Sequence, residues 1–163
     1  MNRISPDQHK LGFIGIGNMG RRIAQRLLEH GYDLAVYNRT REAAEALVQR
    51  GATVAESIAT LSSSADVILS CLANDEAVRR IYTGPEGVLA HVRPGSAIIE
   101  MSTVLPLTSR ELAKLALEAR VNFLDTPISG STPAAEQGTL TLLSIDGEAR
   151  SCGLQQSIAI RAC

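Results

Sequence analysis

Three glycines near the start of the chain constrain its fold more than any other feature. The residues Gly12-Phe-Ile-Gly-Ile-Gly-Asn-Met-Gly20 place the pattern G-x-G-x-x-G at Gly15, Gly17 and Gly20, directly behind the apolar run 11–16. In a strand–turn–helix unit, the first glycine permits a tight turn, the second lets the backbone touch a pyrophosphate, and the third lets the helix pack closely on the strand. The pattern therefore predicts a pyrophosphate site at a helix N-terminus.

The pattern alone is weak evidence, so its context matters. Asn18 is a candidate N-cap, Ile23 and Leu27 recur at helical spacing, Gly31 is a helix stop, and a second apolar run follows at 34–37. The predicted order of strand, turn, helix and strand is that of a βαβ unit that binds a dinucleotide. The alternative is a structural glycine turn that binds no ligand.

The residues after the second strand predict which dinucleotide fits. Asn38, Arg39 and Thr40 stand where a carboxylate would accept hydrogen bonds from the ribose of NAD. A guanidinium at this place can bind a 2′-phosphate, so NADP is favoured and NAD remains possible. Arg39 as an ordinary exposed cation is the alternative. A methyltransferase that uses S-adenosylmethionine would need an acidic residue here, which the chain lacks.

Composition excludes several classes of function. The chain has 163 residues, of which 45% are hydrophobic and 20% are charged, and its net charge is −1. This balance offers no basic surface for a nucleic acid, and no apolar run is long enough to span a membrane. Three cysteines show neither metal-ligand spacing nor a disulfide framework. With a polar leader at 1–10 in place of a secretory signal, the expected location is cytoplasmic.

Strand-like and helix-like segments alternate along the chain, which predicts an α/β fold with a doubly wound, mostly parallel Rossmann sheet and helices on both faces. Segments 11–148 are expected to form this dinucleotide-binding domain, and 149–163 an atypical tail. The predicted strands are 11–16, 34–37, 66–72, 96–101, 121–124 and 140–145. After the first helix, further helices are predicted at 41–50, 57–64, 74–82 and 105–119.

Ligands of such sheets bind beyond the carboxyl ends of the strands, so the residues that follow each strand are candidates. Leu72, Ala73 and Asn74 follow the third predicted strand, and Ser102 and Thr103 follow the fourth. After the fifth, the segment Ser129-Gly130-Ser131 offers hydroxyl and backbone N–H donors for the carboxylate of a small substrate. Each segment could instead be a solvated loop with capping hydroxyls.

Several motifs in order resemble the β-hydroxyacid dehydrogenase family, which includes 3-hydroxyisobutyrate dehydrogenase, tartronate semialdehyde reductase and 6-phosphogluconate dehydrogenase. The motifs are the glycine turn, Met101-Ser-Thr-Val-Leu-Pro106, Asp125-Thr-Pro-Ile-Ser-Gly-Ser131, Ala134-Ala135 and Gly138-Thr139-Leu140. The resemblance covers about 11–148. It implies nicotinamide-linked interconversion of a short 3-hydroxy acid and its semialdehyde.

The resemblance also implies roles for individual residues. Those that would touch the dinucleotide are Gly15, Gly17, Asn18, Met19, Gly20, Leu72, Ala73 and Thr103. Ser129, Gly130 and the residue at position 131 would hold the substrate acid, although the family usually has glycine where this chain has Ser131.

A second departure from the family concerns catalysis. Family members carry a catalytic lysine in a Gly-x-x-x-Lys motif after this domain's last strand, and then a helical domain that dimerises. This sequence contains only Lys10 and Lys114, and neither matches, so no catalytic residue is assigned. The tail 151–163 lacks the expected helix, which suggests a frameshift or early stop. We therefore expect a shortened, catalytically impaired dehydrogenase, with a non-catalytic NADP-binding module as the alternative.

Overall fold

A six-stranded parallel sheet forms the centre of the molecule in a computed structural model, which describes residues 4–142. The strands of this sheet are β1 (Leu11–Ile14), β2 (Leu34–Tyr37), β3 (Thr53–Val54), β4 (Val67–Ser70), β5 (Ala97–Glu100) and β6 (Asn122–Asp125). The helices between them are α1 (Asn18–Glu29), α2 (Arg41–Glu45), α3 (Ile58–Ser64), α4 (Asp75–Tyr82), α5 (Val88–His91) and α6 (Pro106–Glu118). A single 3₁₀ turn, η1, covers Val48–Arg50.

The strand order places the predicted site at a defined point of the sheet. The order is β3-β2-β1-β4-β5-β6, and every neighbouring pair is parallel. The chain moves outward from β1 to β3 and then crosses back to place β4 on the other side of β1. Crevices at such switch points, beyond the carboxyl ends of the strands, are where doubly wound sheets bind nucleotides. The predicted fold class is confirmed.

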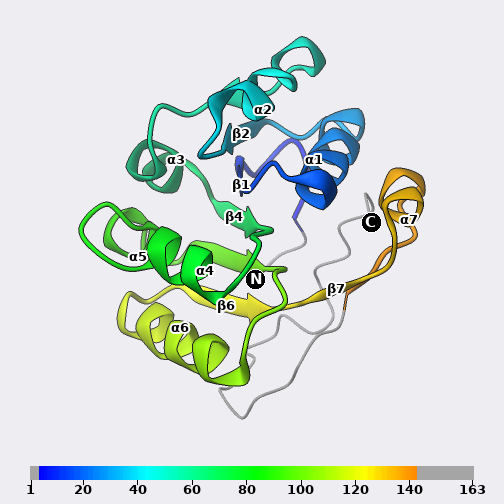
Figure 1. Ribbon diagram of the computed structural model, residues 1–163. Coiled ribbons are helices and arrows are strands. Elements are labelled where there is room, and N and C mark those ends of the chain that lie inside the picture. Colours follow the sequence, from blue (N-terminus) through cyan, green and yellow to red (C-terminus); the bar gives the residue numbers. More distant parts are fainter. Residues whose placement is uncertain (1–3, 143–163) are drawn as a thin grey trace.

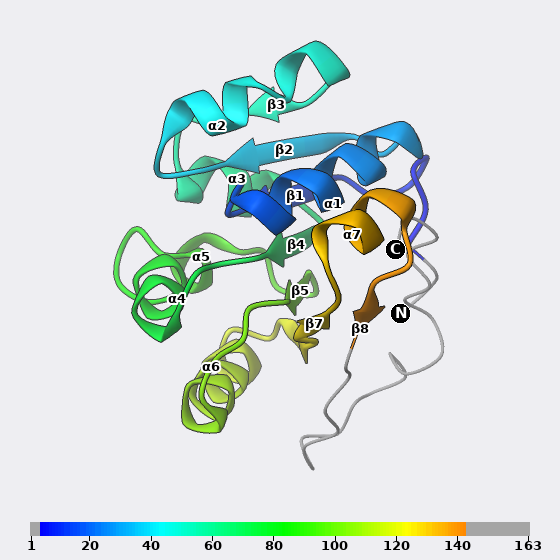
Figure 2. The same ribbon diagram turned by 45° about the vertical axis from the view of Figure 1, so that its right-hand side comes forward.

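Helices cover both faces of the sheet because the strand side chains alternate between two apolar layers (Figures 1 and 2). On one face, Phe13 and Leu69 pack with Leu27 of α1, and α2 covers the same layer. On the other face, Ile68 and Ile98 pack among residues of α3, α4, α5 and α6. Strands buried on both faces are typical of parallel sheets, and they explain the continuous apolar runs in the sequence.

The last predicted strand, 140–145, is wrong as a member of the main sheet. Thr141–Leu142 forms β8, which pairs antiparallel with β7 (Ile128–Ser129) in a separate two-stranded sheet. Leu140 is not part of a strand, and residues 143–145 lie outside the described residues. The sixth place in the main sheet belongs to β3, which was not predicted. β3 has one exposed and one half-buried residue and therefore carries no apolar run.

Two helix predictions also need correction. The predicted helix 41–50 is divided into α2 and η1, since the chain turns at Leu47, whose side chain is fully buried. The four-residue helix α5 was not predicted, and its length explains why no helical period could reveal it. Gly31 does end α1 as predicted, with a positive φ of 80° directly after the C-cap residue His30.

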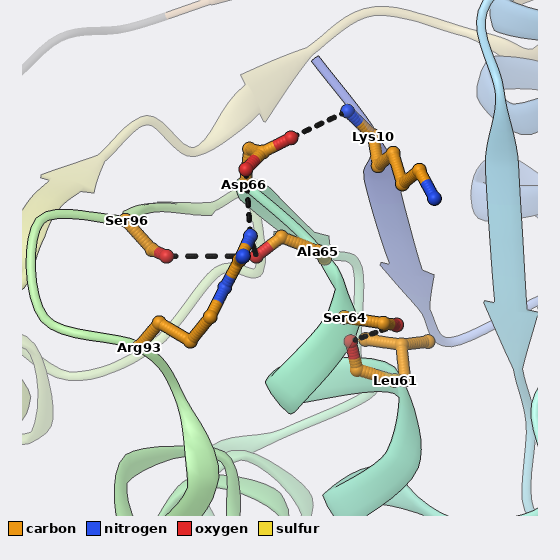
Figure 3. A network of polar contacts seen from close by, with 7 residues as sticks. All are labelled: Lys10, Leu61, Ser64, Ala65, Asp66, Arg93 and Ser96. Carbon is orange, nitrogen blue, oxygen red and sulfur yellow. Dashed lines mark hydrogen bonds and ion pairs between the residues drawn. The ribbon is translucent and has the colours of Figure 1, made fainter.

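A polar network fastens the opposite edge of the sheet, where the strands begin (Figure 3). The backbone N–H of Lys10 donates to Asp66 Oδ2 at 2.8 Å, and Arg93 Nη2 donates to Asp66 Oδ1 at 2.6 Å and to the carbonyl of Ala65 at 3.2 Å. Asp66 therefore joins the start of β1 to the start of β4 and to the turn before β5. Half-exposed ion pairs of this kind contribute at most about 1 kcal/mol.

The packing of α1 on the sheet yields a prediction. Leu27 is fully buried, so Leu27→Ala should lower the free energy of unfolding by about 2–5 kcal/mol, measured by urea denaturation. The matched control is Leu117→Ala on α6, where the side chain is 75% exposed and the loss should stay below about 0.5 kcal/mol. Equal losses in the two variants would contradict the described packing.

Candidate functional site

Two glycines of the turn are required by the packing of the protein itself. Gly15 has a φ of 97°, and a side chain there would overlap the carbonyl oxygen of Cys71 at the end of β4. A side chain at Gly20 would overlap the carbonyl oxygen of Gly15. The end of β1, the start of α1 and the end of β4 thus approach one another more closely than any residue but glycine allows.

Gly17 differs, because nothing in the fold requires a glycine there. Its φ of −79° and ψ of −162° suit any residue, and no described atom lies within 4 Å of where a Cβ would stand. Gly17 is the N-cap residue of α1, so the prediction that Asn18 caps this helix is wrong. Asn18 is instead the first helical residue, and its Oδ1 accepts from Arg22 Nη1 at 2.6 Å.

The N-cap residue of α1, Gly17, consequently offers no side-chain cap to the amides of the first turn. The N–H of Gly20 hydrogen-bonds to Cys71, whereas the first N–H groups of any helix otherwise lack intrahelical acceptors. These groups carry the positive end of the helix dipole and point away from α1 beside the open space at Gly17. Amides and space together suit a phosphate group.

Asn38 holds the glycine turn against the end of β2. Its Oδ1 accepts from the backbone N–H of Ile16 at 2.9 Å, and its Nδ2 donates to the carbonyl of Thr40 at 2.9 Å. The side chain is thereby committed to the protein, which the sequence did not reveal. Arg39 and Thr40, which follow Asn38, are exposed.

A pocket of about 160 Å³ opens beside the same loop. Its lining includes Arg39, Arg41 and Glu56, and the full set is Tyr37, Asn38, Arg39, Arg41, Val54, Ala55 and Glu56. Arg41 forms an ion pair with Glu45 at 2.9 Å, whereas Arg39 forms none with any residue of the described range 4–142. Arg39 is therefore available for an anion.

A larger hollow of about 300 Å³, between the carboxyl ends of α4 and α6, lies away from the predicted site residues.

Hydrogen bonds join the loops that follow β4 and β5. The N–H of Leu72 donates to Ser102 Oγ at 2.7 Å, and Asp75 Oδ1 accepts from the N–H of Leu105 at 2.9 Å and from Thr108 Oγ1 at 2.5 Å. Asn74 caps α4 through the N–H of Ala77 at 2.9 Å, so its side chain is also used locally.

The predicted residues Ala73 and Thr103 are exposed on these joined loops. Leu72, on the same loop as Ala73, is half-buried. The structure thus brings the two loops together at the carboxyl edge of the sheet, next to the glycine turn.

Glu100, at the end of β5, was not singled out from the sequence. It is only 1% exposed, its Oε2 accepts from Ser70 Oγ, and its Oε1 accepts from the N–H of Ser102 at 2.7 Å. Tyr82 completes the cluster, since its hydroxyl lies 2.5 Å from Ser70 Oγ. Burial raises the pKa of the Glu100 carboxyl above its usual range, although these hydrogen bonds oppose the shift. A glutamate that ends an otherwise apolar strand was the available signal.

The predicted substrate segment leaves the sheet beside this cluster. The N–H of Thr126 donates to the carbonyl of Glu100 at 2.8 Å, and the N–H of Ile128 donates to that of Met101 at 3.4 Å. The chain then enters β7 and the short helix α7 (Thr132–Gln137). Ser129, Gly130 and Ser131 are all exposed.

Helix α7 is attached to the helix that carries the glycine turn. Figures 1 and 2 both show α7 beside α1. Arg22 of α1 forms an ion pair with Glu136 at 2.6 Å and also donates to Asn18. The predicted substrate segment, which precedes α7, is therefore held on the same side of the molecule as the predicted cofactor residues.

Comparison with known proteins agrees with this geometry. Residues 10–153 match the family described as the NAD binding domain of 6-phosphogluconate dehydrogenase. The chain belongs to this family. A probable mitochondrial 3-hydroxyisobutyrate dehydrogenase of Dictyostelium discoideum is 39% identical over 133 residues, which are 82% of this chain and 41% of that protein.

Two further relatives show the range of the family. The cytokine-like nuclear factor N-PAC of Xenopus tropicalis is 37% identical over 141 residues, which are 86% of this chain and 26% of that protein. The solved structure of Psf3 in complex with NADP+ and 2-OPP superposes with a TM-score of 0.80 at 34% identity, over 82% of this chain and 48% of that one. The chain thus spans less than half the length of each of these three proteins.

Asp75 provides a prediction about pH. Hydrogen bonds from Thr108 and then from Leu105 hold the pKa of its carboxyl below the ordinary value of 3.8. Because the folded-state pKa lies below the unfolded one, ionised Asp75 stabilises the fold above pH 3.8, and this contribution disappears as the pH falls through the folded-state pKa. Asp75→Asn should therefore be less stable than the parent at neutral pH, with a difference that narrows in acid.

Urea denaturation of both proteins from neutral to acidic pH measures this difference. Asp33→Asn, the same chemical change at an exposed position before β2, is the control and should track the parent at every pH. A stability gap for Asp75→Asn that stays constant as the solution is acidified would show that the carboxylate charge plays no part.

Proposed function

We propose that this domain binds NADP with its pyrophosphate on the glycine turn, as the cofactor domain of an oxidoreductase that interconverts a short 3-hydroxy acid and its semialdehyde. The observation that carries the proposal is Gly17. The fold leaves a glycine, open space and uncapped helix amides at one point, and a bound phosphate explains all three. Membership in a family of NAD binding domains supports the same conclusion.

The preference for NADP over NAD is supported by the pocket at the end of β2. Arg39 has no ion-pair partner within residues 4–142, and it lines a pocket of about 160 Å³ that could accept a phosphate on the adenosine ribose. A guanidinium binds phosphate oxygens through paired, charge-assisted hydrogen bonds. The related Psf3 structure contains NADP+.

The proposed substrate is a small carboxylate-bearing molecule. The exposed hydroxyls of Ser129 and Ser131, with the N–H groups around Gly130, form a set of donors suited to a carboxylate. The relative from Dictyostelium discoideum is named for a 3-hydroxy acid, 3-hydroxyisobutyrate. We infer that Ser129 and Ser131 orient the acid group of such a substrate while Thr103 lies on the neighbouring loop.

The nicotinamide of a bound NADP would supply the hydride chemistry. This chain's residues would bind and orient both reactants, and a group that moves the proton on the substrate oxygen is also required. Lys10 lies before β1 at the opposite edge of the sheet, and Lys114 lies on α6, so neither is proposed for that step. The predicted frameshift and the tail 151–163 lie outside the described residues.

A non-catalytic NADP-binding module is the second candidate. It is favoured by the positions of Lys10 and Lys114, and by a relative that is named as a nuclear factor. Measuring NADPH oxidation with small semialdehydes or glyoxylate separates the two, because the module binds the nucleotide without turnover.

The cytoplasmic location stays a prediction. Among residues 4–142, no helix is both long and apolar enough to cross a membrane.

The glycine turn gives the first test. Gly17→Ala should fold with unchanged stability, or with about 0.4–1 kcal/mol more, because alanine suits the backbone at this position and restricts the unfolded chain. The added methyl group should nevertheless weaken NADPH binding at least about tenfold by keeping the phosphate from the amides.

Fluorescence titration and urea denaturation measure the two effects of Gly17→Ala separately. Gly20→Ala is the contrasting variant, since its side chain would overlap the carbonyl oxygen of Gly15 and should cost stability as well. If Gly17→Ala binds NADPH as tightly as the parent, the phosphate does not lie on this turn.

Arg39 gives the second test. Arg39→Asp should weaken NADPH binding by about 1–3 kcal/mol, the scale of a lost charge-assisted contact, and should leave NADH binding nearly unchanged. Arg110→Asp, the same change at an exposed position of α6, controls for net charge. Equal effects of the two substitutions on NADPH would remove Arg39 from the phosphate site.

A further inference from the structure

Glu100 stands in an environment that the fold alone does not explain. Its carboxyl is 1% exposed, and its hydrogen-bond partners are neutral groups of Ser70, Ser102 and Tyr82. No ion pair joins it to a cation within residues 4–142. Burying a carboxyl without a cation is costly, and an apolar residue such as Ile98, two positions earlier on the same face, would avoid that cost.

Neutral hydroxyl and N–H groups converge on the Glu100 carboxyl. Ser70 donates to Glu100, and the hydroxyl of Tyr82, which is also a hydrogen-bond partner of Glu100, lies 2.5 Å from Ser70 Oγ. On the other side, the N–H of Ser102 donates to Glu100 at 2.7 Å. The carboxyl thus accepts from the end of β4 and from the loop after β5.

Ser102 extends this arrangement to the surface. While its N–H is held by Glu100, its Oγ accepts from the N–H of Leu72 at 2.7 Å. The chain of contacts therefore runs from the buried carboxyl through Ser102 to the loop after β4. We call Glu100, Ser102 and the N–H of Leu72 the loop lock.

We propose that Glu100 is a positioning residue of the dinucleotide site, which fixes the loop after β4 to the loop after β5 through Ser102. The proposal rests on the proposed function, because Ala73 and Thr103 on these loops are the predicted contacts of the cofactor. Both residues are exposed, so burial does not hold them. Glu100 itself is too deeply buried to touch a ligand.

The benefit of such a lock is preorganisation. Two exposed loops from different strands lose conformational freedom when a ligand orders them, and that loss weakens binding. A buried acceptor that sets the loops beforehand reduces the loss, as supporting groups do in other binding sites. The adenosine end of the ligand would lie across the sheet near β2 and β3, where the loop lock has no contact.

The test uses the complete chain and four variants. Ser102→Ala removes the acceptor for Leu72, Glu100→Leu removes the carboxyl, and the double variant removes both. Glu100→Gln keeps the shape and one acceptor for the N–H of Ser102. The matched control is Ser62→Ala on α3, which deletes a fully buried hydroxyl that has no partner within the described residues.

Two probes divide the site into its halves. NADPH would reach both loops, whereas adenosine 2′,5′-bisphosphate lacks the nicotinamide half and would reach the pocket near Arg39 and the glycine turn but not the loop after β5. Ser102→Ala and Glu100→Leu should each weaken NADPH binding about three- to tenfold. The double variant should bind NADPH no more weakly than whichever single variant binds it less tightly, because both substitutions break the same set of contacts. Binding of the bisphosphate should be unchanged in all of them. Glu100→Gln and Ser62→Ala should bind both probes like the parent.

Hydrogen exchange of the Leu72 amide in the ligand-free protein supplies a readout that needs no cofactor. The amide should be protected in the parent and in Glu100→Gln, and should exchange faster in Ser102→Ala and Glu100→Leu. Unchanged exchange would overturn the lock, whatever the titrations show. If the variants lost affinity for both probes alike, or if the losses of NADPH affinity added up in the double variant, Glu100 would have only a general structural role.

The remaining outcome concerns the proposed function. If the parent protein binds neither NADPH nor the bisphosphate, the proposed function fails and Glu100 has no dinucleotide site to position, even where the amide exchange behaves as expected. If the parent binds both probes and the lock variants bind them equally well, the proposed function stands and the positioning role is overturned.

Discussion

The close approach of three backbone segments at the centre of the sheet is the constraint on which the rest of the structure depends. Gly15, Gly20 and the carbonyl of Cys71 meet where β1 ends, α1 begins and β4 ends. A single methyl group at either glycine would separate these elements. Helix α1 covers one face of the sheet, and β4 begins the half of the sheet that lies beyond β1. This contact therefore sets the positions of the two halves of the sheet at the switch point, where the crevice lies.

Two polar clamps extend this order to the loops on either side of the turn. On the β2 side, Asn38 accepts from the N–H of Ile16 and so fixes the glycine turn beside the pocket that Asn38 and Arg39 line. On the β5 side, Glu100 and Ser102 fix the loop after β4. Both clamps use side chains to satisfy backbone N–H groups that the end of a strand leaves unpaired. The loops that would contact a ligand are therefore held in place by side-chain hydrogen bonds within the protein.

The sequence predicted the elements whose signal is local. The strands with apolar runs, the helix stop at Gly31 and the set of loops at one edge all follow from periodicity and glycine spacing. β3 was missed because one exposed and one half-buried residue form no apolar pattern, and Glu100 was missed because its partners Ser70 and Tyr82 come from distant positions. The hydrogen bond between Asn38 and the N–H of Ile16 was not predicted for the same reason, because the two residues are 22 positions apart.

The glycines themselves separate what the fold needs from what a ligand needs. Gly15 and Gly20 would be glycine in any protein with this packing, whether or not it bound a nucleotide. At Gly17 the backbone is ordinary, the surrounding space is empty, and a larger residue would cost the fold nothing. A glycine in the interior of the pattern that folding does not require is better evidence for a ligand than the pattern as a whole, because packing alone gives no reason for it.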